Sequence, residues 1–176
     1  MGFTPLEGLM MGTRSGSVDP GILTYLMREK VADGQQLDQL LNHQSGLLGI
    51  SGVSGDMREI QKAKDSGNQR AKLAFDIFVH RLRSGIGSMV AGLGGLDALI
   101  FTAGIGENSE AVRQAVCETF GYLGLKLDSA KNRHSPIDED IAEQDSRVRV
   151  LVIRAQEDWA IACECWRMVR KGKAGS

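Results

Sequence analysis

The chain has 176 residues, of which 42% are hydrophobic and 24% charged, and its formal net charge at pH 7 is −1. These values suit one globular domain with its own core, and neither the charge nor the 5% aromatic content favours nucleic acid or a membrane as a partner. The chain shows no apolar run of about 20 residues, no signal peptide, and three cysteines without disulfide spacing, which together favour a cytoplasmic protein with reduced thiols.

The amino-terminal segment is expected to be a glycine-rich loop followed by two short helices. Residues 1–19 hold Arg14 between glycines and small residues, so this arginine either faces a ligand or lies in a solvated loop. Asp19 is the predicted N-cap of a helix over residues 20–30, which has proline at its first position. A second helix is expected over residues 35–44, with its leucines turned inward.

The next segment is expected to lead into one long helix. Residues 47–55 are apolar and interrupted by glycine, which predicts a loop or a short extended piece before a helix over residues 59–64. Asp56 and Arg58 lie beside this glycine-rich run, and they either bind a ligand or form a helix cap and an exposed charge. Residues 68–93 keep a helical spacing of apolar side chains, which predicts a mostly buried helix whose glycines pack closely against another element.

The second half of the chain is organised around residues 97–108, an apolar run that ends in a glycine turn. The turn opens a predicted helix over residues 109–120. Such a unit can hold a phosphate, because glycines let the backbone approach an anion and the free N–H groups of the helix's first turn point at it. The alternative is an ordinary turn between a strand and a helix, where glycine is also common.

The last part of the chain is expected to repeat this strand–turn–helix pattern. Residues 129–147 are polar and predict a surface loop, residues 147–153 a strand, and residues 157–170 a closing helix. Two strands that each run into a helix indicate an α/β fold, in which ligands collect at the carboxyl ends of the strands. Glu157 near the Gly104 turn would suit a Mg²⁺–nucleotide complex, and its alternative is a first-turn helix carboxylate.

Four ordered segments carry a resemblance to a known family. They are Met1 to Gly16 with Asp19-Pro20, Gly49-Ile50-Ser51-Gly52 with Asp56-Met57-Arg58, Asp97 to Ser109, and the end strand with Glu157. Together they resemble the acetate kinase family, which belongs to the acetate and sugar kinase, Hsp70 and actin superfamily. The resemblance implies an incomplete ribonuclease H-like nucleotide-binding domain over residues 1–170, followed by a frayed tail over residues 171–176.

The same resemblance implies an activity and a set of site residues. Family members transfer the γ-phosphoryl group of ATP to acetate with Mg²⁺, giving acetyl phosphate and ADP, and the reaction is reversible. By motif, Arg14 is similar to the arginine that stabilises the transferring group, and Glu157 to the Mg²⁺-associated glutamate, although the neighbours of Glu157 differ from the family's usual Thr-Asn-Glu-Glu. The segment that contacts adenosine is matched by Asp56, Met57 and Arg58. The second nucleotide-binding loop is matched by Gly104, Ile105, Gly106, Glu107 and Asn108.

The resemblance also covers only the carboxyl-terminal portion of the family's longer chains. It implies that the pocket for acetate or another short-chain carboxylic acid lies outside this chain, so we expect the chain alone to have no acetate kinase activity. An uncovered sheet edge or core face would make it unstable or self-associating. Family members are homodimers, and the helix over residues 68–93 suits the dimer interface. The alternatives are a propionate kinase fragment and a catalytically inactive fragment for nucleotide binding and dimerisation.

Overall fold

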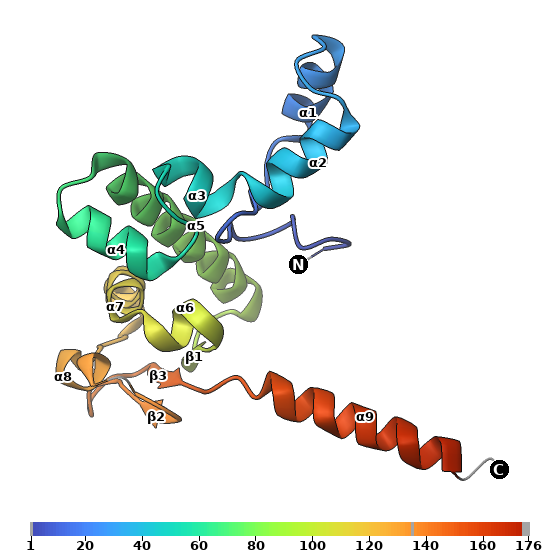
Figure 1. Cartoon of the computed structure of the whole chain (residues 1–176). Helices are drawn as coiled ribbons and strands as arrows, with labels where there is room; N and C mark the ends of the chain where they lie inside the picture. The colour runs from blue at the N-terminus through green and yellow to red at the C-terminus, as the bar shows by residue number, and fades with distance from the viewer. Residues whose placement is uncertain (1, 135, 174–176) are drawn as a thin grey trace.

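Helices packed on a small sheet make up the body, from which an amino-terminal arm and a carboxyl-terminal helix project (Figure 1). The structure is a computed structural model that describes residues 2–134 and 136–173. In chain order its elements are α1 (Pro20–Arg28), α2 (Gly34–His43), α3 (Gly46–Ser51), α4 (Met57–Asp65), α5 (Gln69–Leu93), β1 (Ala98–Phe101), α6 (Ala103–Asn108), α7 (Glu110–Thr119), the 3-10 helix η1 (Gly121–Leu123), α8 (Ser129–Arg133), β2 (Glu139–Asp140), β3 (Arg149–Val152) and α9 (Glu157–Lys173).

The sheet has the order β1–β3–β2 among the described residues. β1 and β3 are parallel, in a register that pairs Ala98 with Arg149 and Phe101 with Val152, whereas β2 is antiparallel to β3. Alternate residues of β1 and β3 are buried in one core with side chains of α5 and α7. The predicted α/β class, with two strands that each lead toward a helix, is therefore confirmed.

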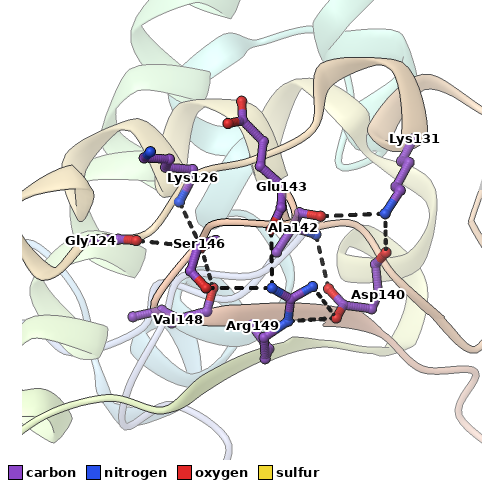
Figure 2. A network of polar contacts seen from close by, with 9 residues as sticks. All are labelled: Gly124, Lys126, Lys131, Asp140, Ala142, Glu143, Ser146, Val148 and Arg149. Carbon is purple, nitrogen blue, oxygen red and sulfur yellow. Dashed lines mark hydrogen bonds and ion pairs between the residues drawn. The ribbon is translucent and has the colours of Figure 1, made fainter.

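The segment before β3 is not the surface loop that its polar composition predicts. It contains α8 and β2, and it buries Ile141 and Ala142 completely. Arg149 donates from Nε to the Asp140 carboxylate at 2.7 Å, and Lys131 donates from Nζ to the main-chain carbonyls of Asp140 and Ala142 (Figure 2). The prediction is wrong because charged side chains of this segment bond to other groups of the protein, both a carboxylate and main-chain carbonyls, and local composition does not show such partners.

α5 is the long helix that the sequence predicts, with Asn68 as its N-cap, but only its first half is buried. Met89 and Leu93 in its second half are 63% and 75% exposed. A Cβ atom built at Gly87 or Gly92 would meet nothing within 4 Å, so these glycines do not serve close packing within the described residues. None of the described helices is long and apolar enough to cross a membrane.

Two other helices, α1 and α9, also expose apolar side chains to solvent. α1 begins as predicted, with the Asp19 carboxylate accepting the Gly21 N–H at 2.8 Å, yet none of its residues is buried. On α9, Trp159 and Trp166 are 67% and 56% exposed. α9 continues to Lys173, so the tail expected over 171–176 begins inside this helix, and residues 174–176 lie outside the described part of the chain.

The three cysteines are free thiols, as expected from their spacing. Cys117 on α7 is buried, and this burial raises the pKa of its thiol to about 12. The thiol therefore stays protonated at neutral pH and behaves as an apolar core side chain. Cys163 and Cys165 lie on α9, where Cys165 is exposed.

Candidate functional site

A cleft of about 1140 Å³ brings together residues from four distant parts of the chain, three of which hold predicted site residues. Arg14 contributes from the amino-terminal loop, residues 56–58 from the start of α4, and Gly104, Ile105 and Asn108 from α6. A second cavity of about 300 Å³ shares Gly104 and Asn108 with the cleft and is also lined by Glu107 and Glu157. Gly106 is the one predicted site residue that lines neither cavity within the described residues.

The loop that carries Arg14 is seated on the first turn of α3. The N–H of Leu47 donates to the carbonyl of Met11 at 3.0 Å, and the N–H of Met11 donates to the carbonyl of Arg14 at 3.0 Å. Gly46 permits this contact, because its φ is +62° and a Cβ atom there would lie 2.2 Å from the Met11 carbonyl oxygen. The predicted loop over residues 47–55 is therefore wrong in part, since its first residues belong to α3.

Arg14 brings an unpaired positive charge to the cleft. Its guanidinium makes one long contact, from Nη1 to the Met11 sulfur at 3.9 Å, and no carboxylate within the described residues pairs with it. A cation held on a fixed loop, without an internal counter-charge, is suited to an anionic ligand.

Two glycines let the Arg14 loop meet the start of α4. A Cβ atom on Gly12 would lie 2.8 Å from the carbonyl oxygen of Gly55, and one on Gly55 would lie 2.9 Å from that of Gly12. Neither glycine stands out in the sequence from the many others. Their close approach brings the Arg14 loop next to the start of α4, and Arg14 and Asp56 both line the cleft.

Asp56 and Arg58 form a cap and an ion pair at the beginning of α4. The Asp56 carboxylate accepts the Arg58 N–H at 2.8 Å, and it accepts from the guanidinium at 3.0 Å through Nε and 2.5 Å through Nη2. The hydrogen bond from the Arg58 side chain lowers the pKa of Asp56 to about 2. The pair lies at the surface and stays ionised at neutral pH, so it offers the cleft polar atoms rather than net charge.

The predicted glycine turn is itself a short helix, α6, whose residues do different things. It begins at Ala103, which has a φ of +59°, a strained value for a residue with a side chain. Gly104 faces open space, whereas a Cβ atom on Gly106 would lie 3.3 Å from the carbonyl carbon of Phe101. Asn108 donates from Nδ2 to the Gly104 carbonyl at 2.8 Å, which fixes its side chain at the edge of the cleft.

Glu107 and Glu157 follow the parallel strands β1 and β3 in the chain, and both line the smaller cavity. The Glu107 carboxylate accepts the Ala155 N–H at 2.8 Å and so ties α6 to the turn before α9. Glu157 is the exposed first residue of α9, and Asp158 lines the same small cavity. Within the described ranges, no group of three or more His, Cys, Asp or Glu residues could hold a metal ion.

Asn42 and His43 at the end of α2 also line the cleft, although nothing in the sequence singles them out as site residues. They are held there because the Thr13 hydroxyl donates to the Asn42 carbonyl at 3.0 Å. No local pattern predicts a contact between residues so far apart in the chain.

Comparisons with known proteins give one consistent result. The model of the acetokinase family matches residues 1–163. An acetate kinase of Nostoc punctiforme is 68% identical over 170 residues, which are 97% of this chain and 42% of that protein. The crystal structure of Porphyromonas gingivalis acetate kinase superposes with a TM-score of 0.86 at 41% identity, over 94% of this chain and 42% of the other. A Francisella tularensis propionate kinase structure gives 0.81 at 41% identity, over 89% and 40%. The chain thus spans less than half the length of these relatives.

Proposed function

Because the chain belongs to the acetokinase family, we propose that it forms the carboxyl-terminal, nucleotide-binding portion of an enzyme that transfers a phosphoryl group from ATP to acetate. The observation that carries this proposal is the cleft itself. It is lined by Arg14, residues 56–58 and the α6 residues Gly104 and Asn108. The family resemblance implies each of these as a site residue from sequence motifs alone. The proposed acceptor is a short-chain carboxylic acid, since both an acetate kinase and a propionate kinase have this fold.

In this proposal Arg14 stabilises the phosphoryl group during transfer. Phosphoryl transfer depends on positioning and on charge stabilisation rather than on a protein nucleophile. Arg14 carries its charge on a loop that α3 holds in place, and it has no carboxylate partner among the described residues. Such a cation needs little reorganisation when negative charge develops on the phosphoryl oxygens.

The rest of the cleft binds the nucleotide. Asp56, Met57 and Arg58 contact the adenosine part, and residues 104–108 form the wall near the phosphates. Gly104 supports this role, because the space in front of its Cα is open toward the cleft. Glu107 contributes through its hydrogen bond to Ala155, which keeps the two walls of the smaller cavity together.

The residues around the smaller cavity fit a Mg²⁺ ion that is bound together with a nucleotide. Mg²⁺ takes oxygen ligands and is usually held by one or two carboxylates together with substrate phosphates and water. Glu157 and Asp158 supply carboxylate oxygens beside Gly104, where the phosphates are proposed to lie. When bound, the ion would neutralise phosphate charge and orient the transferring group. Glu157 is the residue proposed to hold it.

A hybrid enzyme tests the proposed reaction. The chain is joined to the portion of the Nostoc punctiforme relative that it lacks, and acetyl phosphate formed from ATP, acetate and Mg²⁺ is trapped with hydroxylamine. We expect turnover by the hybrid and none by the chain alone, and at least about 100-fold slower turnover for the Arg14→Ala hybrid, because one charge-stabilising group is lost. His80→Ala is the control, since His80 is exposed on α5 and outside the cleft. A folded hybrid without turnover, or an Arg14→Ala hybrid as fast as the parent, would contradict the proposal.

The role of Glu157 predicts a metal-dependent change in affinity. Glu157→Gln removes the charge that attracts Mg²⁺, so we expect the affinity of the chain for MgATP to fall about tenfold, which corresponds to about 1.4 kcal/mol. The affinity for ATP in the presence of a chelator should be unchanged. Calorimetric titration measures both. Glu164→Gln, which alters a carboxylate farther along α9 that pairs with Arg167, is the matched control and should bind MgATP like the parent.

A second candidate function is a non-catalytic fragment that binds nucleotide and a second copy of itself. The exposed apolar residues Leu73, Met89 and Leu93 on α5 favour it, because they supply a surface for the homodimer that the family resemblance implies. MgATP binding by a dimeric hybrid that gives no acetyl phosphate would favour this candidate over the enzyme.

A further inference from the structure

Arg113 on α7 is a buried cation whose partners are all backbone or amide oxygens. Its side chain is 1% exposed, and no carboxylate within the described residues pairs with it. Nη1 donates to the carbonyls of Gly106 at 2.9 Å and Glu107 at 2.7 Å. Nε donates to the side-chain oxygen of Asn132 at 2.7 Å, and Nη2 to its carbonyl at 3.0 Å.

These contacts join the glycine-bearing helix to the body of the protein. Gly106 and Glu107 lie in the last turn of α6, where carbonyl groups have no partner within the helix. Asn132 lies on α8, is buried itself, and donates from Nδ2 to the Glu110 carbonyl at the start of α7 at 3.2 Å. The guanidinium therefore holds α6, α7 and α8 in one arrangement.

Burial of this charge is unfavourable unless its hydrogen bonds offset the loss of water. Desolvation lowers the pKa of Arg113 from its ordinary value, although a guanidinium stays protonated in proteins. An apolar side chain could fill the same space without that penalty. An apolar side chain cannot donate hydrogen bonds, whereas Arg113 donates to four oxygens and so fixes their positions. Two of these oxygens belong to α6.

We propose that Arg113 is a positioning residue for the nucleotide cleft, acting by fixing the carbonyl end of α6 so that Gly104 and Asn108 keep their places on the cleft wall. This inference rests on the proposed function. α6 has only six residues, and a helix this short is not stable without outside contacts. Arg113 does not line the cleft, so its effect on a nucleotide must pass through the elements that it holds, which are α6 and the start of α7, where Glu110 and Ala111 also line the cleft.

Arg83 provides a matched control for the test. It also places a guanidinium on a main-chain carbonyl, since Nε of Arg83 on α5 donates to the Ala115 carbonyl on α7 at 3.2 Å. This contact lies outside α6 and outside the cleft. Arg83→Met therefore removes the same kind of interaction from a carbonyl that does not line the cleft.

The experiment measures MgATP affinity of the whole chain by calorimetry, at a temperature where circular dichroism shows the variants to be folded. We expect Arg113→Met to weaken binding about tenfold or more, Arg83→Met to change it less than about twofold, and Arg113→Lys to fall between, because lysine keeps the charge but not the planar fork. Hydrogen exchange should be faster at the amides of Glu107, Asn108 and Ser109 in Arg113→Met and unchanged there in Arg83→Met.

Two results would overturn the inference. One is a folded Arg113→Met variant with the parent's affinity and the parent's exchange rates in α6. The other, which applies if Arg113→Met does not fold, is an Arg113→Lys variant that exchanges like the parent over residues 107–109. If the parent chain does not bind MgATP, the proposed function fails, and the exchange measurement still decides whether Arg113 holds α6.

Discussion

Replacing Gly46 by alanine is expected to lower the free energy of unfolding by about 2–5 kcal/mol, the sum of a strained backbone and a steric overlap. Gly46 has a φ of +62°, in the left-handed region that disfavours residues with a Cβ atom. The added methyl group would lie 2.2 Å from the Met11 carbonyl oxygen and 2.7 Å from that of Arg14. Both are main-chain atoms, so neither can move aside as a flexible side chain would.

Urea unfolding followed by circular dichroism measures this effect. The control is Gly34→Ala, because Gly34 is the first residue of α2, a Cβ atom there would meet nothing within 4 Å, and its φ is not positive. The control should leave stability unchanged or raise it by up to about 1 kcal/mol. Equal midpoints for the two variants would contradict the prediction. Since the displaced atoms belong to the Arg14 loop, any folded Gly46→Ala protein should also bind MgATP more weakly.

The parts of the fold that sequence predicts are those whose causes are local. Asp19 is the N-cap that the sequence predicts for α1, and α5 begins within one residue of its predicted start. The apolar runs that become β1 and β3 are recognisable because strand formers are concentrated in them. The errors concern contacts, or the lack of contacts, that local composition does not show. Arg149 and Lys131 organise a segment that looks like a loop, and Met89 and Leu93 are apolar without being buried.

In the candidate site, too, the sequence predicts which residues belong together but not how each of them is oriented. The motifs mark Arg14, Asp56 and Gly104, and the structure brings all three to one cleft. A motif assigns all its residues to the same site, however, whereas in the structure the residues of α6 have different surroundings. Gly106 packs against the backbone of Phe101, and Glu107 bonds to Ala155. Those assignments depend on which way each residue faces in α6, and that orientation is set by contacts absent from the motif.

Because Gly104 faces open space whereas Gly106 is packed, we expect the substitution Gly104→Val to weaken nucleotide binding without unfolding the chain. The space around a Cβ atom at Gly104 is empty to 4 Å, and Gly104 lines both cavities. Valine can therefore be added without disturbing the core, and its three carbons would occupy the space proposed for the nucleotide. We expect MgATP affinity to fall at least about 30-fold, which corresponds to about 2 kcal/mol, while the melting temperature stays close to that of the parent.

The matched control is Gly92→Val on α5, where a Cβ atom also meets nothing within 4 Å, and Gly92 lines neither of the two cavities. It should bind MgATP like the parent, because the two substitutions share their chemistry and differ in place. Gly106→Val should behave in a third way and destabilise the chain, since its Cβ atom would press on the carbonyl carbon of Phe101 at 3.3 Å. If Gly104→Val binds MgATP as tightly as Gly92→Val, then α6 does not form the nucleotide wall, and the site must be sought elsewhere in the cleft.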